Sequence, residues 1–460
     1  MTANSNIFNA YLTTPASITQ KALQAAVDIE ERSRKEQAQL NKDFYYGKQE
    51  QTLVMMNEDV DPLIINLTKP IMDKRCRLLY SRPLHRTFNG PAESVAHVEA
   101  VYADNAIDSL LQQADLLSEL TGSVLIHPYI DETAESGYRL RIYDATQFSA
   151  VGNDGDPNTA DAISLVRVVD RVTDGSRLGQ DGSIKSERIL AQQIWTREAV
   201  VFYEGNLLKG STENPLGFLP FVNIHGEAVH DEFIGYAPAV NVRKLNNQIN
   251  QLMTHLAFTI KMQAGTPIAF SGYKSGESVT LHPGRAINLP AGATASVLNL
   301  DPKINETLDA VKYLEDRLFA TSNVPKITIE GGDGDKTHIS GAQLMVRWYP
   351  LITVFNQKAV NFRRYELALA NLICAVAGLP MIDSVEIDYP EETVTPSISD
   401  PAQLEQDLRF GLTNAIDELQ KRNPLYTDME AEVEWRTNME LNSALYTTET
   451  NNGSTNSTQI

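Results

Sequence analysis

Hydrophobic and polar positions change their period twice along the chain, which separates helical segments from a sheet segment. Before residue 120, apolar residues recur at helical spacing and predict helices over 16–46, 67–82 and 92–120, with Ser17 as the first N-cap. Between residues 120 and 232 the period shortens to two, and Gly, Asp and Asn turns separate the runs. This segment predicts a mainly antiparallel sheet, with strands over 123–129, 139–143, 148–151, 164–172, 188–196 and 200–203.

The clearest helical pattern covers residues 238–264, and a second apolar stripe over 302–322 can pair with it. Between them, short apolar runs over 267–270, 278–281, 286–289 and 295–300 are separated by glycine turns. The pattern predicts an antiparallel helical stalk with a small all-β tip. The stalk should be packed by Val242, Leu245, Ile249, Leu252 and Leu256 on the first helix and by Ile304, Leu308 and Val311 on the second.

Polar residues of the first stalk helix bear on whether the chain is an oligomer. Its neutral amides favour contact with other helices around a ring, because a fully solvated helix usually carries more charge. The alternative is an intramolecular hairpin in a monomer. The amides in question are Asn246, Asn247, Gln248, Asn250 and Gln251.

The chain beyond residue 322 mixes breaks, a long helix and a short strand. Asn323-Val324-Pro325 ends the second stalk helix, and a glycine-rich stretch follows it. A helix is predicted from Ser340, as N-cap, to Gly378, with Pro350 breaking or kinking it. A strand over 384–389, helices over 402–422 and 428–442, and a disordered Asn/Ser/Thr-rich tail over 447–460 complete an α+β chain.

Net charge restricts the classes of partner. The 39 basic and 59 acidic residues leave a formal charge of −20, which disfavours tight DNA binding through many phosphate contacts and binding to an anionic membrane. The most apolar stretch, Leu367–Ile382, is too short for a bilayer span and contains Asn371. With two cysteines and a polar stretch over Met1–Tyr11, we expect a soluble protein made in a reducing cytoplasm, without a disulfide framework.

Three stretches contain residue types found in chemical sites, and each departs from its pattern. The stretch Gly331–Thr337 resembles a phosphate-binding loop, but Asp335 replaces the glycine before the lysine and would repel phosphate. In the stretch 225–232, two histidines lie five residues apart, which a helical zinc motif does not allow. Asp154, Asp156 and Asn158 lack the later residues of a calcium loop. We therefore expect no catalytic site, no cofactor and no metal.

The order of the segments, together with several local motifs, resembles the portal proteins of tailed bacteriophages. The resemblance spans residues 45 to 435. The motifs that carry it are Tyr45-Tyr46-Gly47 followed by Asn66, Asp73 and Leu79 to Pro83; Leu120 to Ile126; Asn214 to Phe221 followed by Gly235, Leu245-Asn246 and Ile249-Asn250; Val324-Pro325 followed by Ser340-Gly341-Ala342 and Leu344; and Gly411-Leu412-Thr413, Pro424, Asp428, Glu430 and Glu432.

The resemblance implies a portal-type fold with named regions. These are a wing with a helical N-terminus and an antiparallel sheet over 1–232, a first stem helix over 233–266, a β-rich clip over 267–300, a second stem helix over 301–325, a channel loop and a long kinked wing helix over 326–385, a helical crown over 386–446 and a tail over 447–460.

The resemblance also implies a function without catalysis. Portal proteins form a ring, usually of twelve subunits, at one capsid vertex of the virion, and they assemble in the host cytoplasm. Double-stranded DNA passes through the ring without sequence specificity during packaging and ejection. The implied partners are the ring's own subunits, the large terminase subunit, head-completion or adaptor proteins, and the major capsid and scaffolding proteins. An acidic wall would suit such a channel, because each phosphate contact would add a barrier to sliding.

In the family, the channel loop lies between the second stem helix and the long kinked helix, and two segments of this chain meet that condition. One contains Gly331, Gly332, Asp333, Asp335 and Lys336, and the other contains Arg347, Trp348 and Tyr349 before Pro350. Core packing is the alternative for Trp348 and Tyr349.

Two other functional classes stay open from the residues alone. One is a metal- or nucleotide-dependent hydrolase that uses residues 225–232 or 331–337. The other is a head-morphogenesis protein that binds its partners without forming a ring.

Overall fold

The computed structural model describes most of the chain between residues 28 and 390 and short pieces beyond it. The described residues are 28–50, 61–153, 155–156, 158–172, 186–205, 207–264, 268–271, 292, 294–297, 304–330, 341–390, 416, 429 and 432–437. The predicted tail over 447–460, the strands over 278–281 and 286–289, and Ser17 lie outside them. The chain forms two compact units, the first of residues 1–337 and 346–394 and the second of residues 338–345 and 395–460.

The first two described helices are shorter than the pattern predicts. Helix α3 (Ile29–Tyr45) begins after Asp28, whose carboxylate accepts a hydrogen bond from the Glu30 amide, so a single helix over 16–46 is wrong. Helix α4 (Thr68–Cys76) ends well before residue 82. Three apolar residues within the predicted range, Leu78, Leu79 and Tyr80, are instead buried in the core on irregular chain.

The helix predicted over 92–120 is two helices, α5 (Ala92–Asp104) and α6 (Ile107–Thr121). The break lies at Asn105 and Ala106, and Ala106 has a left-handed backbone with φ 45°. Apolar periodicity continues across this break, because both helices bury a face in the same core. The pattern alone therefore does not reveal it.

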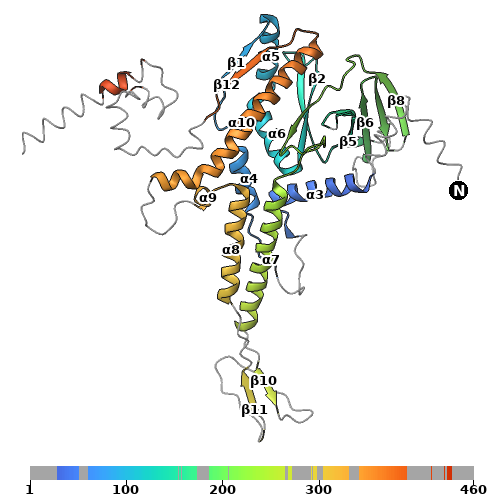
Figure 1. Ribbon diagram of the computed structural model, residues 1–460. Helices are drawn as coiled ribbons and strands as arrows, with labels where there is room; N and C mark the ends of the chain where they lie inside the picture. The colour runs from blue at the N-terminus through green and yellow to red at the C-terminus, as the bar shows by residue number, and fades with distance from the viewer. Residues whose placement is uncertain are drawn as a thin grey trace, which may run out of the picture. The chain divides into compact units, whose positions relative to one another are not determined.

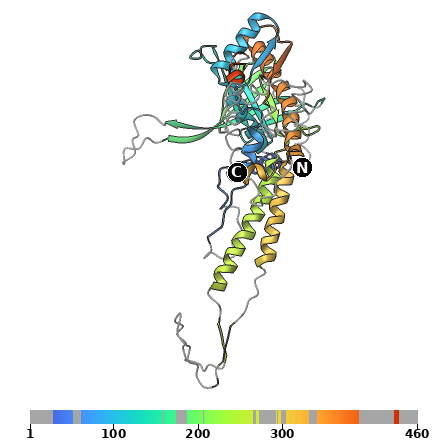
Figure 2. The ribbon, with the colours of Figure 1, turned by 90° about the vertical axis from the view of Figure 1, so that its left-hand side faces the viewer.

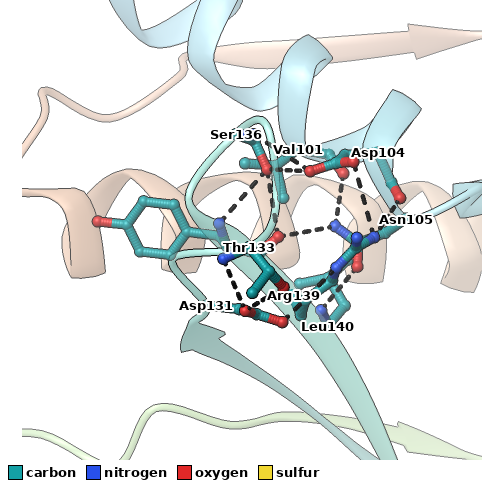
Figure 3. A network of polar contacts seen from close by, with 9 residues as sticks. Val101, Asp104, Asn105, Asp131, Thr133, Ser136, Arg139 and Leu140 are labelled. Atoms are coloured by element: carbon teal, nitrogen blue, oxygen red, sulfur yellow. Dashed lines mark hydrogen bonds and ion pairs between the residues drawn. The ribbon is translucent and has the colours of Figure 1, made fainter.

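A network of polar contacts holds the break in place (Figure 3). The Asn105 side chain donates to the Val101 carbonyl at 2.8 Å and accepts from the Leu140 amide at 2.9 Å. The Asp104 carboxylate accepts from the amide and hydroxyl of Ser136, and the Asp104 carbonyl accepts from Arg139 at 2.7 Å. The end of α5 is thus bonded to the hairpin of β2 (Ser123–Ile130) and β3 (Tyr138–Asp144), which redirects the chain into α6.

The sheet segment forms two antiparallel sheets, which confirms an α+β fold. A three-stranded sheet has the order β3–β2–β9, and a five-stranded sheet has the order β4–β5–β6–β7–β8. Two smaller antiparallel pairs join β1 to β12 and β10 to β11. The strands are β1 (Arg86–Asn89), β2 (Ser123–Ile130), β3 (Tyr138–Asp144), β4 (Phe148–Gly152), β5 (Ala160–Val172), β6 (Ser186–Thr196), β7 (Ala199–Glu204), β8 (Leu207–Glu213), β9 (Val222–His225), β10 (Ile268–Ser271), β11 (Thr294–Val297) and β12 (Ser384–Ile387).

The strands β1, β8 and β9 were not predicted from the sequence. Two of them have only four residues, too few for a period of two to stand out. Strand β8 lies at a sheet edge and is exposed along most of its length. In contrast, the β5–β6 ladder extends past its neighbours, since pairing with β4 ends at Leu165 and pairing with β7 ends at Ala191. Figure 2 shows this hairpin projecting from the body of the first unit.

Two long helices, α7 (Ala239–Ala264) and α8 (Ile304–Ser322), run side by side and are called the stem below (Figures 1 and 2). The β10–β11 pair belongs to the chain that connects them. After α8 come the short helix α9 (Ile327–Glu330) and the 37-residue helix α10 (Gly341–Ala377). Among the described residues, no helix is both long and apolar enough to cross a membrane.

One large hydrophobic core joins the stem to the rest of the first unit. It contains residues of α4, α5, α6, β2, α7, α8, α10 and β12. The part of the stem that contains Val242, Ile249 and Leu318 is therefore not a separate hairpin, because its apolar seam continues into this core.

Candidate functional site: the stem and its buried junction with α10

The seam between the two stem helices contains most of the predicted packing residues. On α7, Val242, Ile249 and Leu256 are buried, while Leu245 and Leu252 are partly buried against the same core. On α8, Val311 is buried and Ile304 is half-buried. Leu308 is 36 % exposed and lies at the edge of the seam, whereas Leu318, seven residues after Val311 on the same face, is fully buried.

Helix α7 presents three stripes of side chains about 120° apart, as a period of 3.6 residues allows. One stripe is apolar and faces α8. A second, polar stripe faces the extended segment 61–67, which runs beside α7. The third is exposed or half-buried and consists of Asn241, Lys244, Gln248, Gln251 and His255.

The polar stripe bonds the backbone of segment 61–67 in the way a neighbouring strand would. Thr254 Oγ1 accepts from the Leu63 amide at 3.0 Å, and Asn250 Oδ1 accepts from the Ile65 amide at 2.9 Å. Asn246 donates to the Ile65 carbonyl at 2.8 Å. Both asparagines have no exposed surface, so these bonds satisfy polar groups that burial would otherwise leave unpaired.

This ladder corrects one interpretation of the amide face. Asn246 and Asn250 are covered by their own chain, so they do not offer a surface to a neighbouring helix. No local pattern indicates this contact, because segment 61–67 lies about 180 residues before the asparagines that bind it. Only Gln248 of the five amides is exposed.

Glycines allow the chain to enter α7 through a tight crossing. Gly226 donates to the Gly122 carbonyl at 2.9 Å, and Gly235 donates to Ser123 Oγ at 2.9 Å. A Cβ on Gly226 would lie 2.5 Å from the Ser118 carbonyl oxygen, and a Cβ on Gly122 would collide with the Gly235 carbonyl. Gly122 also has φ +97°. The direction of the stem therefore depends on these close backbone contacts.

Four buried charged side chains connect the end of the stem at Ser322 to α4, α6 and α10. Arg75 donates to both oxygens of Glu119, at 3.0 and 3.1 Å, and also to the carbonyl of Ser322, the last residue of α8. Lys358 of α10 donates to both oxygens of Asp115, at 2.6 and 2.8 Å, and lies 2.9 Å from Glu119. Each of the four side chains is at most 10 % exposed.

Burial and neighbouring charges move the two carboxyl pKa values apart. Burial raises the pKa of Asp115 to about 6, although Lys358 opposes this change. Burial would also raise the pKa of Glu119, but Arg75 and Lys358 outweigh it and lower that pKa to about 2. Glu119 is therefore the firmly ionised member of this group, which we call the ionic junction.

A second buried charge holds α10 two helical turns further along. Glu366 is fully buried and accepts hydrogen bonds from Arg86 Nε and, at 3.2 Å, from the Tyr80 hydroxyl. Arg86 also donates to Asp108 of α6 at 2.6 Å. Together with Lys358, this contact fixes both the position and the rotation of α10 against α6 and β1.

The sequence contains a signal for the two buried charges of α10. Lys358 and Glu366 fall on the apolar stripe of α10, at helical spacing from the buried residues Leu351, Phe355, Phe362, Leu369 and Ile373. A charged residue on a buried stripe is rare unless it is paired. The identity of the partners could not be predicted, because they come from segments more than 240 residues away.

The structure describes the second of the two channel-loop candidates but not the first. Gly331, Gly332, Asp333, Asp335 and Lys336 lie outside the described residues. Arg347, Trp348 and Tyr349 are not in a loop, because α10 continues through Pro350. Arg347 and Tyr349 are exposed, whereas Trp348 packs against the core with Lys74 Nζ 5.3 Å from its ring centre. The exposed position of Pro350 explains its tolerance, since water can bond the carbonyl that loses a helical partner.

The histidines considered for metal binding do not converge. His225 is half-buried, and its ring bonds Asn223 and the Phe233 carbonyl. His230 is almost fully exposed beside Asp231. Within the described ranges, no three His, Cys, Asp or Glu side chains are grouped to hold a metal ion. Cys76 and Cys374 are buried free thiols.

Comparison with known proteins gives one family match. The model of the family described as "Phage portal protein, SPP1 Gp6-like" matches residues 26–402. No curated protein matches the chain. Two similar solved structures are a chain in the neck of an empty gene transfer agent particle (13 % identity, TM-score 0.44, covering 77 % of this chain and 90 % of that one) and a chain in the virion of a native gene transfer agent particle (14 %, 0.39, 76 % and 86 %).

Proposed function

Because the chain belongs to the SPP1 Gp6-like family of phage portal proteins, we propose that it forms a homo-oligomeric ring at one capsid vertex, through which DNA is packaged and later ejected. The observation that carries this proposal is the family match itself. It runs from residue 26 to residue 402 and so includes both sheets, the stem and all of α10.

The described elements fit portal regions in chain order. In this proposal, α3 to β9 form most of the wing, α7 and α8 form the stem, and β10 and β11 belong to the clip between residues 267 and 300. Helix α10 returns to the wing, and residues 386–446 form the crown. The channel loop would then fall between α9 and α10, in residues 331–340.

The junctions found here suit a subunit that carries load. The ionic junction bonds the last residue of α8 to α4, and the same group binds α10 through Lys358. A displacement of α10 would therefore reach the stem through paired buried charges, which are costly to separate. In a packaging ring, this connection would transmit force between the wing and the stem.

The net charge of the chain supports the proposed role of the ring as a channel for DNA. A net charge of −20 per subunit favours weak, transient contact with phosphates, because held phosphates would resist sliding. Repulsion of this kind acts over a Debye length of about 8 Å in physiological salt. The proposed ring performs no catalysis itself, and the energy for DNA movement comes from a docked terminase.

The proposed partners follow from the ring's place in a particle. One end of the ring would dock the large terminase subunit during packaging and head-completion or adaptor proteins afterwards. The wing would contact the major capsid and scaffolding proteins. Assembly would take place in the host cytoplasm, and the ring would stay in the virion. We propose a ring of about twelve subunits.

Negative-stain images of the purified full chain test the ring directly. The proposal predicts round particles with a central, stain-filled hole, together with side views that show a narrow stem below a wider body. Monomers at every concentration and salt tested would contradict it. Such a result would favour a morphogenesis protein that acts without forming a ring.

A further inference from the structure

The stem has an exposed flank on α7 whose one charged side chain is Lys244, because Arg243 is buried against Asn41 and Gln37. Asn241, Lys244 and Gln248 are exposed, and Gln251 and His255 continue the same stripe. Helix α7 contains Arg243, Lys244 and Lys261 but no Asp or Glu in 26 residues, in a chain whose net charge is −20. Its apolar and polar stripes are already covered by α8 and by segment 61–67, so within the part of the chain that the structure describes this flank is the exposed side of the helix.

The flank of α8 on the side away from α7 is negatively charged. Glu306, Asp309, Tyr313 and Asp316 recur at helical spacing and are all exposed. Arg317 lies over the Tyr313 ring at 5.0 Å, and Asp309 lies 3.6 Å from Lys312. The second contact joins side chains that are more than 70 % exposed, so water screens it and it contributes little.

Lys244 on α7 and Asp316 on α8 lie at similar distances from the same end of the stem. A shared cavity of about 50 Å³ is lined by Asn241 and Val242 of α7 and by Thr321 and Ser322 of α8, so these two ends are level. Lys244 follows the start of α7 by five residues, and Asp316 precedes the end of α8 by six. At about 1.5 Å per residue, both side chains lie within about 10 Å of the same end.

We propose that the α7 flank of one subunit docks on the α8 flank of the next, with Lys244 facing Asp316 of the neighbouring copy. This inference rests on the proposed ring and names the contact that selects its direction. The two flanks lie on different sides of one hairpin, so each subunit gives one flank to each neighbour. Such a heterologous contact closes into a ring when the rotation allows it. Electrostatic complementarity rejects the reversed arrangement, in which like charges would meet.

Charge reversal tests the contact. Lys244→Glu alone and Asp316→Lys alone should each raise the protein concentration for half-maximal ring assembly by about tenfold, because each places like charges together at every contact around the ring. The double variant K244E/D316K should restore assembly toward the wild-type concentration. Lys209→Glu on β8 makes the same charge change away from the stem and should assemble as the wild type does. Ring and monomer fractions are measured by mass photometry in buffer of low ionic strength.

The outcomes separate this inference from the ring itself. If the wild type forms rings and both single variants form them equally well, the flanks do not meet and the inference is wrong, although the ring stands. Loss of assembly in the singles without recovery in the double variant would also overturn the pairing. If the wild type forms no rings, the proposed function fails first and the inference fails with it. Thermal unfolding of each variant shows whether the exposed substitutions leave the subunit folded.

Discussion

The side-chain oxygen of Asn246 lies 3.1 Å from the backbone nitrogen of Thr68, so a residue of the stem caps helix α4. The same oxygen accepts from the Leu67 amide and the Thr68 hydroxyl. Helix α4 has no side-chain cap of its own at Leu67. Two segments almost 180 residues apart are therefore folded as one unit, and the position of α4 is fixed by the stem.

Replacing Asn246 tests this cap. Asn246→Ala removes the acceptor of the buried Thr68 amide and of the partly buried Leu67 amide, so the free energy of unfolding should fall by about 3 kcal/mol. Chemical denaturation of the purified protein measures the change. Gln248→Ala, two residues further along on the exposed flank, is the matched control and should alter stability by less than about 0.5 kcal/mol. Equal effects of the two substitutions would show that the ladder does not stabilise the fold.

Glu119→Gln should be strongly destabilising at neutral pH. The substitution leaves the buried Arg75 guanidinium without its ionised partner, and breaking a buried pair in this way costs about 3–5 kcal/mol. The exposed carboxylate Glu306, changed to Gln, is the control and should have almost no effect. A loss of less than 1 kcal/mol for E119Q would mean that the junction is not a tight ion pair.

The same variant has a predictable pH dependence. Because the folded pKa of Glu119 is lowered to about 2, the ionised group stabilises the fold at pH values above its ordinary pKa of about 4.3. This stability is lost as the pH falls toward 2. The difference in unfolding free energy between the wild type and E119Q should therefore shrink between about pH 5 and pH 2. A difference that stayed constant over this interval would contradict the assigned pKa direction.

Gly122→Ala should disrupt the crossing that leads into α7. The new Cβ would collide with the Gly235 carbonyl and would also sit at φ +97°, for a combined cost of about 3 kcal/mol or more. Gly217 has φ +68° and open space around it, so Gly217→Ala should cost only about 1 kcal/mol. Thermal unfolding monitored by circular dichroism compares them. If both variants melt together, backbone strain alone accounts for the effect and the close contact does not matter.

Trp348 and Tyr349 are neighbours in sequence but should differ in their effect on stability. Trp348 packs against the core, so Trp348→Ala should cost about 1–2 kcal/mol. Tyr349 is 68 % exposed, and Tyr349→Ala should change stability by less than about 0.5 kcal/mol. Chemical denaturation separates the two. A large loss for Tyr349→Ala would show that this ring is buried in solution.

Elements with many residues and one buried face could be predicted from the sequence. The pattern located α7, α8, α10 and the strands β2, β3 and β4 within a few residues, because each keeps a single period over its length. It failed at the α5–α6 break, where the apolar period continues but Asn105 and Asp104 bond the β2–β3 hairpin instead. Tertiary hydrogen bonds of this kind leave no local periodic signal.

Residues of the candidate site likewise divide into those that the sequence pattern predicts and those that it does not. Apolar seam residues such as Val242 and Ile249 follow from spacing, since burial repeats with the helix. The partners of Asn246, Lys358 and Glu366 do not, because each partner comes from a distant segment. Arg347 to Tyr349 were considered for a loop on account of Pro350, yet an exposed proline can remain inside a helix. The order of the predicted segments along the chain contributed more to the functional prediction than any single residue did.

Native mass spectrometry of the purified full chain tests the central claim, that this portal-family subunit closes into a ring, most directly. The account predicts one discrete species whose mass is a fixed multiple of the 51.0 kDa subunit, with about twelve copies. A ladder of open chains that grows with concentration would contradict a closed, heterologous ring. A single species at 51.0 kDa over a wide range of concentration and salt would contradict the ring altogether.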